Sequence, residues 1–207
     1  MLTMLDSFCF RDEDRFIFTT DVKSLHTVIP NDKGFHAFKY FLDKRELLNP
    51  KTHTLLRMAE LVLTFNSFVF NSENYKQIGD VAMGSKLGPN YASLFVSYVE
   101  EKMLRVYTGI KPDPYKRYMD DVAGAASCTE DDLTRFLTFV SSYHPKLEYT
   151  WSISSAKLPF LDMLLIPRDD RVATSIHYKE TDSHSYLNFK SSHPLKCKAS
   201  TPASQFL

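Results

Sequence analysis

The sequence of 207 residues has few cysteines, no net charge and no long apolar run. Its cysteines are odd in number and widely spaced (Cys9, Cys128 and Cys197), which argues against a disulfide framework and favours a reducing compartment. Its 25 basic and 25 acidic residues cancel, which argues against a protein that holds nucleic acid by net charge alone. No apolar run approaches the roughly 18 residues of a membrane span, and no basic segment opens a signal peptide. We therefore expect a soluble, intracellular protein without a membrane partner.

Internal repeats and low-complexity tracts are also lacking. Hydrophobic residues make up 43% of the chain and aromatic residues 14%, which is enough to bury a sizeable core and argues against disorder. The length suits one domain, or one domain with the start of another.

The spacing of apolar residues predicts a mixture of strands and helices. The expected strands and hairpins lie at residues 16–20, 68–78, 115–126, 147–153 and 172–178. The expected helices lie after residues 30–32 and 49–50, from Gly88 to Gly109, and from Thr129 to about residue 140. Residues 191–207 show no convincing period. This order indicates an α+β fold, with helices packed on one face of an antiparallel sheet.

Carboxylates stand at two places where this sheet is expected to end. Asp21 closes the first strand, and Asp120 and Asp121 lie at the turn of the second hairpin. If the two elements are neighbours, three carboxylates converge, and like charges at close range raise one another's pKa. Divalent cations such as Mg²⁺ relieve that repulsion and bind carboxylate oxygens together with phosphate. An Asp-Asp pair at a hairpin turn is also common for structural reasons alone, because aspartate tolerates turn geometry.

The segments around these carboxylates resemble the motifs of reverse transcriptases, in the order of that family. Tyr118-Met-Asp-Asp121 resembles its aromatic-variable-Asp-Asp turn. The segment from Phe18 to Pro30 is similar to its first palm motif, particularly as written in Penelope-like retroelements. Three further segments resemble the motifs that follow: Ala82-Met-Gly-Ser-Lys-Leu-Gly-Pro89 with Ala92, Leu158-Pro-Phe-Leu-Asp162, and Tyr178-Lys-Glu-Thr181 with Tyr186-Leu187 and Ser192-His-Pro194. Each match is weak alone, but together they span nearly the whole chain.

The resemblance implies a role for each carboxylate. Asp21 and Asp120 would ligate both of two Mg²⁺ ions, with Mn²⁺ as a substitute, and Asp121 would be an auxiliary carboxylate. The backbone carbonyl of Val22 would ligate the ion on the nucleotide side.

The resemblance also implies a nucleotide-binding segment. Backbone N–H groups of Lys23, Ser24 and Leu25 would contact the triphosphate. His26 stands where the family usually has Tyr or Phe against the sugar 2′ position, so we expect weaker discrimination against ribonucleotides. Gly84 and Ser85 would open the loop that lies under the nascent base pair and the template.

The fold implied by the resemblance is a polymerase palm over residues 1–165, with a partial fingers insertion at about 31–80. Residues 166–207 would be the end of the palm leading to a thumb. We expect the chain to be a fragment, because relatives carry fingers, thumb and endonuclease parts in the same polypeptide. The implied function is RNA-directed DNA synthesis from dNTP on an RNA template and a DNA primer, in the nucleus.

Three other interpretations remain open. The chain could be a catalytically inactive palm remnant that binds nucleic acid weakly at most. A two-metal phosphohydrolase unrelated to polymerases would need ligands beyond this trio. A zinc site at the C-terminal end lacks a second ligand pair at suitable spacing, although four candidate ligands occur there: His177, His184, His193 and Cys197.

Overall fold

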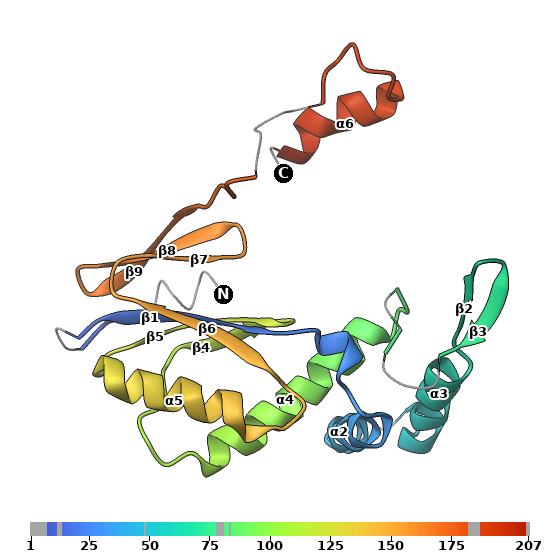
Figure 1. Cartoon of the computed structure of the whole chain (residues 1–207), viewed down its shortest axis with the longest axis horizontal. Coiled ribbons are helices and arrows are strands. Elements are labelled where there is room, and N and C mark those ends of the chain that lie inside the picture. The colour runs from blue at the N-terminus through green and yellow to red at the C-terminus, as the bar shows by residue number, and fades with distance from the viewer. Residues whose placement is uncertain are drawn as a thin grey trace.

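The computed structural model describes residues 8–11, 14–47, 49–77, 81–82, 84–181 and 187–205. Its centre is a four-stranded antiparallel sheet in the order β4-β5-β1-β6. Figure 1 shows helices on one face of this sheet and a second, smaller sheet on the other. The predicted α+β fold with helices on one face of an antiparallel sheet is therefore confirmed, and the second sheet adds a layer that the sequence did not predict.

The main sheet is built from segments far apart in the chain. Its central strands are β1 (Phe16–Val22) and β5 (Asp121–Ala126), and its edges are β4 (Tyr115–Tyr118) and β6 (Tyr149–Ser154). Alternate side chains of a strand face opposite sides of the sheet. In β1 the even-numbered Phe18 and Val22 are buried with the helices, whereas Ile17 is buried on the opposite side.

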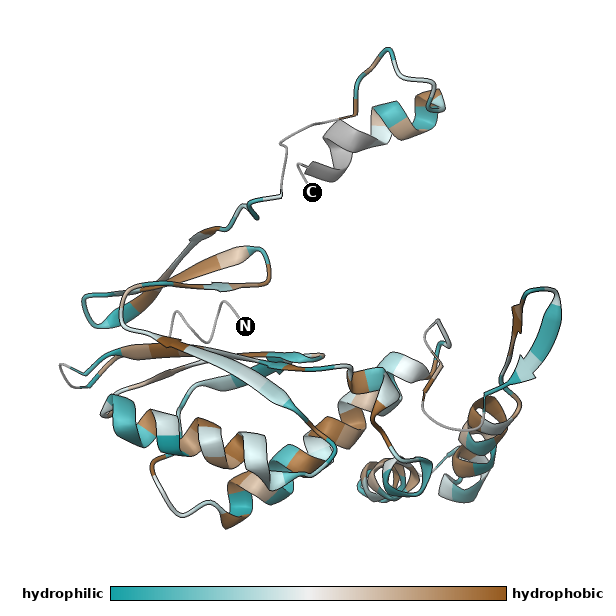
Figure 2. Ribbon diagram, in the orientation of Figure 1, coloured by the Kyte–Doolittle hydropathy of each residue, from teal (hydrophilic) through white to brown (hydrophobic). Residues whose placement is uncertain are grey.

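The helices α4 (Gly88–Val106) and α5 (Glu130–Tyr143) cover the first face. Figure 2 shows hydrophobic and hydrophilic residues interspersed along both helices, and the buried hydrophobic ones form the larger core cluster with β1 and β5. The sequence marks both helix starts. Pro89 stands in the first turn of α4, and the Thr129 hydroxyl caps α5 by accepting a hydrogen bond from the Asp132 amide at 3.2 Å.

The smaller sheet packs on the other face of the main sheet, against Ile17 of β1. It consists of β7 (Leu158–Phe160), β8 (Met163–Arg168) and β9 (Arg171–Ile176) in that order. A second core cluster fills the space between the two sheets, with Phe160, Leu165 and Val172 against Ile17 and two alanines of β5. The strand expected at 172–178 therefore exists but ends at Ile176.

The remaining elements lie beyond the end of the main sheet that carries Asp21 (Figure 1). They begin with the short helix η1 (Leu25–Thr27) and continue through α2 (Asn31–Asp43) and α3 (Thr52–Thr64). A hairpin of β2 (Ser67–Phe70) and β3 (Glu73–Lys76) follows, with Asn71 and Ser72 at its turn. Both helices and this hairpin agree with the sequence, although the turn is tighter than expected. Residues 78–80, at the end of the predicted fingers insertion, lie outside the described residues.

The C-terminal segment forms a helix, α6 (Leu195–Gln205), which Figure 1 shows apart from the two sheets. The sequence did not predict this helix, because its polar residues carry no apolar period. Among the described helices, none has the length and apolar character needed to cross a membrane.

Candidate active site

The fold brings the carboxylates of Asp21 and Asp121 to neighbouring positions on adjacent strands. In the antiparallel ladder of β1 and β5, Asp21 lies directly opposite Asp121. Residues opposite each other in such a ladder project their side chains from the same face. The turn that carries Asp120 is held in the same place, because the Val22 amide donates a hydrogen bond to the Asp120 carbonyl at 3.1 Å. Two loops a hundred residues apart therefore meet at one end of the sheet.

This pair lies on the face that is turned away from α4 and α5. Asp21 follows the buried Thr20 and precedes the buried Val22, so the alternation of the strand directs it to the other side. There a pocket of about 240 Å³ is lined by both carboxylate residues, by Trp151 of β6 and by the chain around Leu161. The site is thus a shallow, partly open depression beside the smaller sheet.

The carboxylates repel one another in this depression. Burial raises the pKa of Asp21, and the neighbouring Asp120 adds to that rise, while Lys23 opposes it. Burial also raises the pKa of Asp121, with further contributions from Asp120 and Asp21. Lys179, from the segment after β9, opposes the rise at Asp121. The protein therefore maintains negative charges close together, which a cation would stabilise.

The chemistry of these donors fits Mg²⁺ or Mn²⁺, because all are hard carboxylate oxygens. Their arrangement is less complete, since within the described ranges no group of three or more His, Cys, Asp or Glu side chains is placed to hold a metal ion. The carboxylates interact electrostatically without converging on one point. The described part of the C-terminal region likewise shows no zinc cluster, and His184 lies outside it.

The segment after Asp21 is the one expected to contact a nucleotide. Ser24 has a left-handed backbone (φ 52°), and the chain then turns into η1 with the Leu25 side chain in the core. The Lys23 amide donates to the Glu148 carbonyl at 2.9 Å, and its ammonium lies 2.6 Å from the Glu148 carboxylate. The Lys23 amide is thus already engaged in the sheet, while Ser24 and Leu25 lie just beyond it.

His26 and the loop around Gly84 lie next to each other. The Val81 amide donates to the His26 carbonyl at 3.0 Å, which ties the loop to η1. The His26 ring is half-buried, and its Nδ1 has no hydrogen-bond partner among the described residues. Gly84 has φ +90°, which side chains rarely adopt, and no described atom lies within 4 Å of the place where a Cβ would stand. Ser85 Oγ accepts from the Gly88 amide at 3.0 Å and so closes the turn into α4.

Two residues near the site were not assigned by the sequence. Lys179 belongs to the Tyr178-Lys-Glu-Thr181 segment that resembles a family motif, where it was given no role, yet its charge acts on Asp121. Arg117 precedes the Tyr118-Asp121 segment and is almost fully buried beneath it. A basic residue directly before an acidic turn was the available signal, but it gives no indication of burial.

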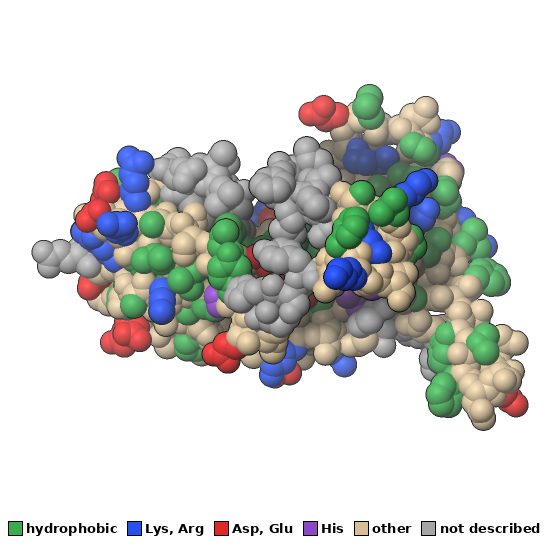
Figure 3. All heavy atoms as spheres, turned by 90° about the horizontal axis from the view of Figure 1, so that it is seen from above, with side chains coloured by type: hydrophobic (Ala, Val, Ile, Leu, Met, Phe, Trp, Pro, Cys, Tyr) green, Lys and Arg blue, Asp and Glu red, His purple; other side chains and the backbone are tan. Residues whose placement is uncertain are grey.

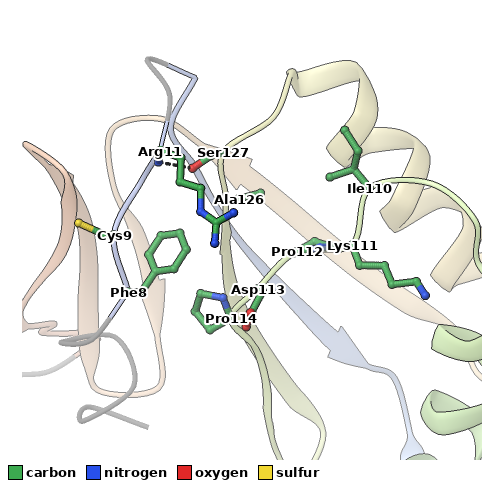
Figure 4. Close-up of a pocket in the computed structure, with 10 residues that line it drawn as sticks. All are labelled: Phe8, Cys9, Arg11, Ile110, Lys111, Pro112, Asp113, Pro114, Ala126 and Ser127. Atoms are coloured by element: carbon green, nitrogen blue, oxygen red, sulfur yellow. Dashed lines mark hydrogen bonds between the residues drawn. The ribbon is translucent and has the colours of Figure 1, made fainter.

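A larger pocket than the one beside Asp21 lies elsewhere, at the opposite end of β5. It encloses about 700 Å³ and is lined by residues that include Phe8, Arg11, Asp113 and Ser127. Figure 4 shows the Arg11 guanidinium directed into it, close to the Phe8 ring. Because Phe16, at the far end of β1 from Asp21, pairs with Ala126 at this edge, the pocket is separate from the carboxylates.

Basic side chains do not form a continuous stripe on the face seen in Figure 3, as far as its coloured residues show. Lys and Arg are scattered there among acidic and neutral groups. This distribution agrees with the balanced charge of the sequence.

The fold is that of a polymerase palm, and solved polymerases are its structural neighbours. Apo telomerase from Candida tropicalis superposes with a TM-score of 0.63 at 12% identity, over 80% of this chain and 33% of that one. Telomerase from Candida albicans, in complex with a TWJ fragment of telomeric RNA, gives 0.63 at 11% identity, over 93% and 34%. The RNA-dependent RNA polymerase of a human picobirnavirus gives 0.56 at 12% identity, over 79% and 30%.

These likenesses establish the fold, at identities too low to carry function. The chain spans about a third of the length of each of these polymerases. No protein-family model matches the sequence, and no curated protein matches it.

Proposed function

We propose that the chain is the palm of an RNA-directed DNA polymerase of a retroelement similar to the Penelope-like group. The observation that carries the proposal is the direct pairing of Asp21 with Asp121 beside the Asp120 turn. A structural turn explains an Asp-Asp pair, but it does not explain a third carboxylate opposite it on the next strand. The neighbours' fold supports a nucleotidyl-transfer chemistry, and the motif resemblance points to reverse transcription.

In this proposal Asp21 and Asp120 hold two Mg²⁺ ions, with Asp121 and the Val22 carbonyl as further ligands. When bound, the ions activate a primer 3′-hydroxyl and stabilise the pyrophosphate leaving group. The protein's own contribution is to hold these carboxylates at one end of the sheet and to orient the incoming nucleotide. We assign the triphosphate contact to the amides of Ser24 and Leu25, because that of Lys23 donates to Glu148. By the motif resemblance, Gly84 and Ser85 would contact the template side, and His26 would face the sugar.

A second candidate is an inactive palm that binds nucleic acid weakly. The scattered basic side chains of Figure 3 and the incomplete convergence of the carboxylates favour it. Affinity for nucleic acid depends on clustered phosphate contacts, which this face offers sparingly.

Primer extension with Mg²⁺ or Mn²⁺ on an RNA template separates the two candidates. Asp120→Asn is expected to abolish extension by the chain, because the amide removes a metal-ligating charge. The chain supplies a matched control in Asp169-Asp170, a second Asp-Asp pair at the exposed turn between β8 and β9. Asp169→Asn should leave extension unchanged. No extension by the unaltered chain would support the inactive palm, whereas equal extension by Asp120→Asn would refute the assignment of Asp120 as a metal ligand.

A further inference from the structure

The Arg117 side chain is buried beneath the carboxylate turn, and its hydrogen bonds connect that turn to α4. Its exposed fraction is 9%, and that of its ion-pair partner Glu100 is 11%. Arg117 projects from the helix-facing side of β4, because it lies opposite the buried Val122. Removing such a charge from water is unfavourable unless every polar group finds a partner.

All five N–H groups of the guanidinium have an acceptor. Nε donates to Glu100 Oε2 at 2.8 Å, and Nη1 donates to Ser93 Oγ at 3.2 Å and to the Met119 carbonyl at 2.7 Å. Nη2 donates to the Ser93 carbonyl at 3.1 Å and to Ser97 Oγ. Four of these acceptors belong to α4, and the fifth is the backbone of the turn. The planar guanidinium has five N–H donors and can bind these five acceptors at once, whereas a lysine ammonium has only three donors.

The turn needs such a restraint because its backbone is unusual. Met119 has φ 56°, in the left-handed region that is unfavourable for residues other than glycine. Strained conformations of this kind persist where surrounding contacts hold them. Glu100 is itself fixed, since the Tyr115 hydroxyl donates to its Oε1 at 3.0 Å.

We propose that Arg117 is a positioning residue for the carboxylates: it holds the Met119 carbonyl against α4 and thereby sets where Asp120 and Asp121 stand. Its consequence for catalysis rests on the function proposed above, whereas its effect on the turn does not. The alternative is that Arg117 only joins β4 to α4 and contributes general stability.

Two backbone amides report on the turn and on the strand separately. The Val22 amide donates to the Asp120 carbonyl, and the next amide, Lys23, donates to Glu148 on the other side of β1. If Arg117 positions the turn, Arg117→Lys should speed hydrogen exchange at Val22 by about tenfold relative to Lys23. The same variant should bind Mn²⁺ about tenfold more weakly and lower kcat for extension more than it changes KM for the nucleotide.

Two further variants complete the test. Glu101→Gln is the matched control on the same helix, because Glu101 forms ion pairs with Lys44 and Arg105 and does not contact Arg117. This variant should change neither the exchange at Val22 relative to Lys23 nor the affinity for Mn²⁺. Ser97→Ala removes one acceptor of Arg117 while favouring the helix, and should speed exchange at Val22 by about threefold even if Arg117→Lys does not fold.

Equal acceleration at Val22 and Lys23, or none at either, would overturn the positioning role. Selective acceleration at Val22 in a protein that neither binds Mn²⁺ nor extends a primer would uphold the positioning role and refute the proposed function.

Discussion

At the scale of single residues, the two Asp-Asp turns of this chain differ in their surroundings. Asp120-Asp121 lies opposite Asp21, and burial and mutual repulsion raise the pKa of Asp121. Asp170 instead accepts a hydrogen bond from the Cys9 thiol at 2.8 Å, which lowers its pKa. Both turns carry an Asp-Asp pair, but the residues around the pair differ. The Tyr118-Met-Asp-Asp121 motif and the strand that ends at Asp21 distinguished the candidate site.

The repulsion predicts that Asp121→Asn stabilises the metal-free protein at neutral pH. A carboxyl whose folded pKa is raised binds more protons in the folded state than in the unfolded state. Its ionisation therefore removes stability as pH rises from below about 3.8 through the folded pKa. After solvent screening we expect a rise in Tm of about 2 °C at pH 7 for Asp121→Asn.

Thermal unfolding at pH 7 and at pH 3 measures this difference. The gain should vanish at pH 3, where both proteins are neutral at residue 121. Adding Mn²⁺ should stabilise the unaltered chain and reverse the order. A variant less stable than the parent at pH 7 without metal would show that the carboxylates do not repel as described.

His26 provides a second prediction at this scale. Its half-buried ring carries an unpartnered Nδ1, a polar atom that lacks compensation among the described residues. His26→Phe removes that atom and restores a larger ring at the position expected to face the sugar. We expect unchanged or higher stability and a greater preference for dNTP over rNTP, by about tenfold. Competitive single-nucleotide extension measures the ratio, and an unchanged ratio would place His26 away from the sugar.

At the scale of the elements, the close approach of β1, β5 and the chain before β4 depends on Gly124. A Cβ at this position would lie 2.4 Å from both the Phe18 ring and the Pro114 carbonyl oxygen. Phe18 is fully buried between the sheet and the helices, so its ring has little space to move.

Gly124→Ala is therefore expected to destabilise the fold by about 2 kcal/mol or more through overpacking. Gly84→Ala is the matched comparison: its surroundings are open, and only the positive φ opposes it, which costs about 1 kcal/mol. Urea unfolding of both variants measures the two costs. Equal and small effects would contradict the packing described around Phe18.

At the scale of the whole molecule, the sequence predicted the helices and strands better than the way in which they pack into layers. The strand ending at Asp21, the helices α2 to α5 and both hairpins were predicted because their apolar periods and end signals are local. Of the smaller sheet only β9 was predicted. β7 has three residues, and the place of this sheet depends on contacts with Ile17 and the alanines of β5, which are distant in sequence. Helix α6 was missed because it has no apolar face that the sequence could display.

The candidate site was likewise predicted where local motifs mark it and missed where it depends on contacts between distant segments. Asp21, Asp120 and Asp121 were found through motifs, and their juxtaposition followed once β1 and β5 were taken as neighbours. Arg117 could not be found in this way, because its role depends on acceptors on α4 that lie 17 to 24 residues before it in the chain. The division into palm and fingers at about residues 31–80 stays a prediction.

The central claim is that Asp21, Asp120 and Asp121 share divalent cations at one end of the sheet. Titration with Mn²⁺, followed by paramagnetic broadening of backbone amide signals, tests it most directly, with Asp169 and Asp170 as an internal control. We predict early and selective broadening at residues 20–22 and 120–122, which Asp120→Asn should largely remove. Broadening of equal strength at both Asp-Asp turns, or none at either, would contradict the claim.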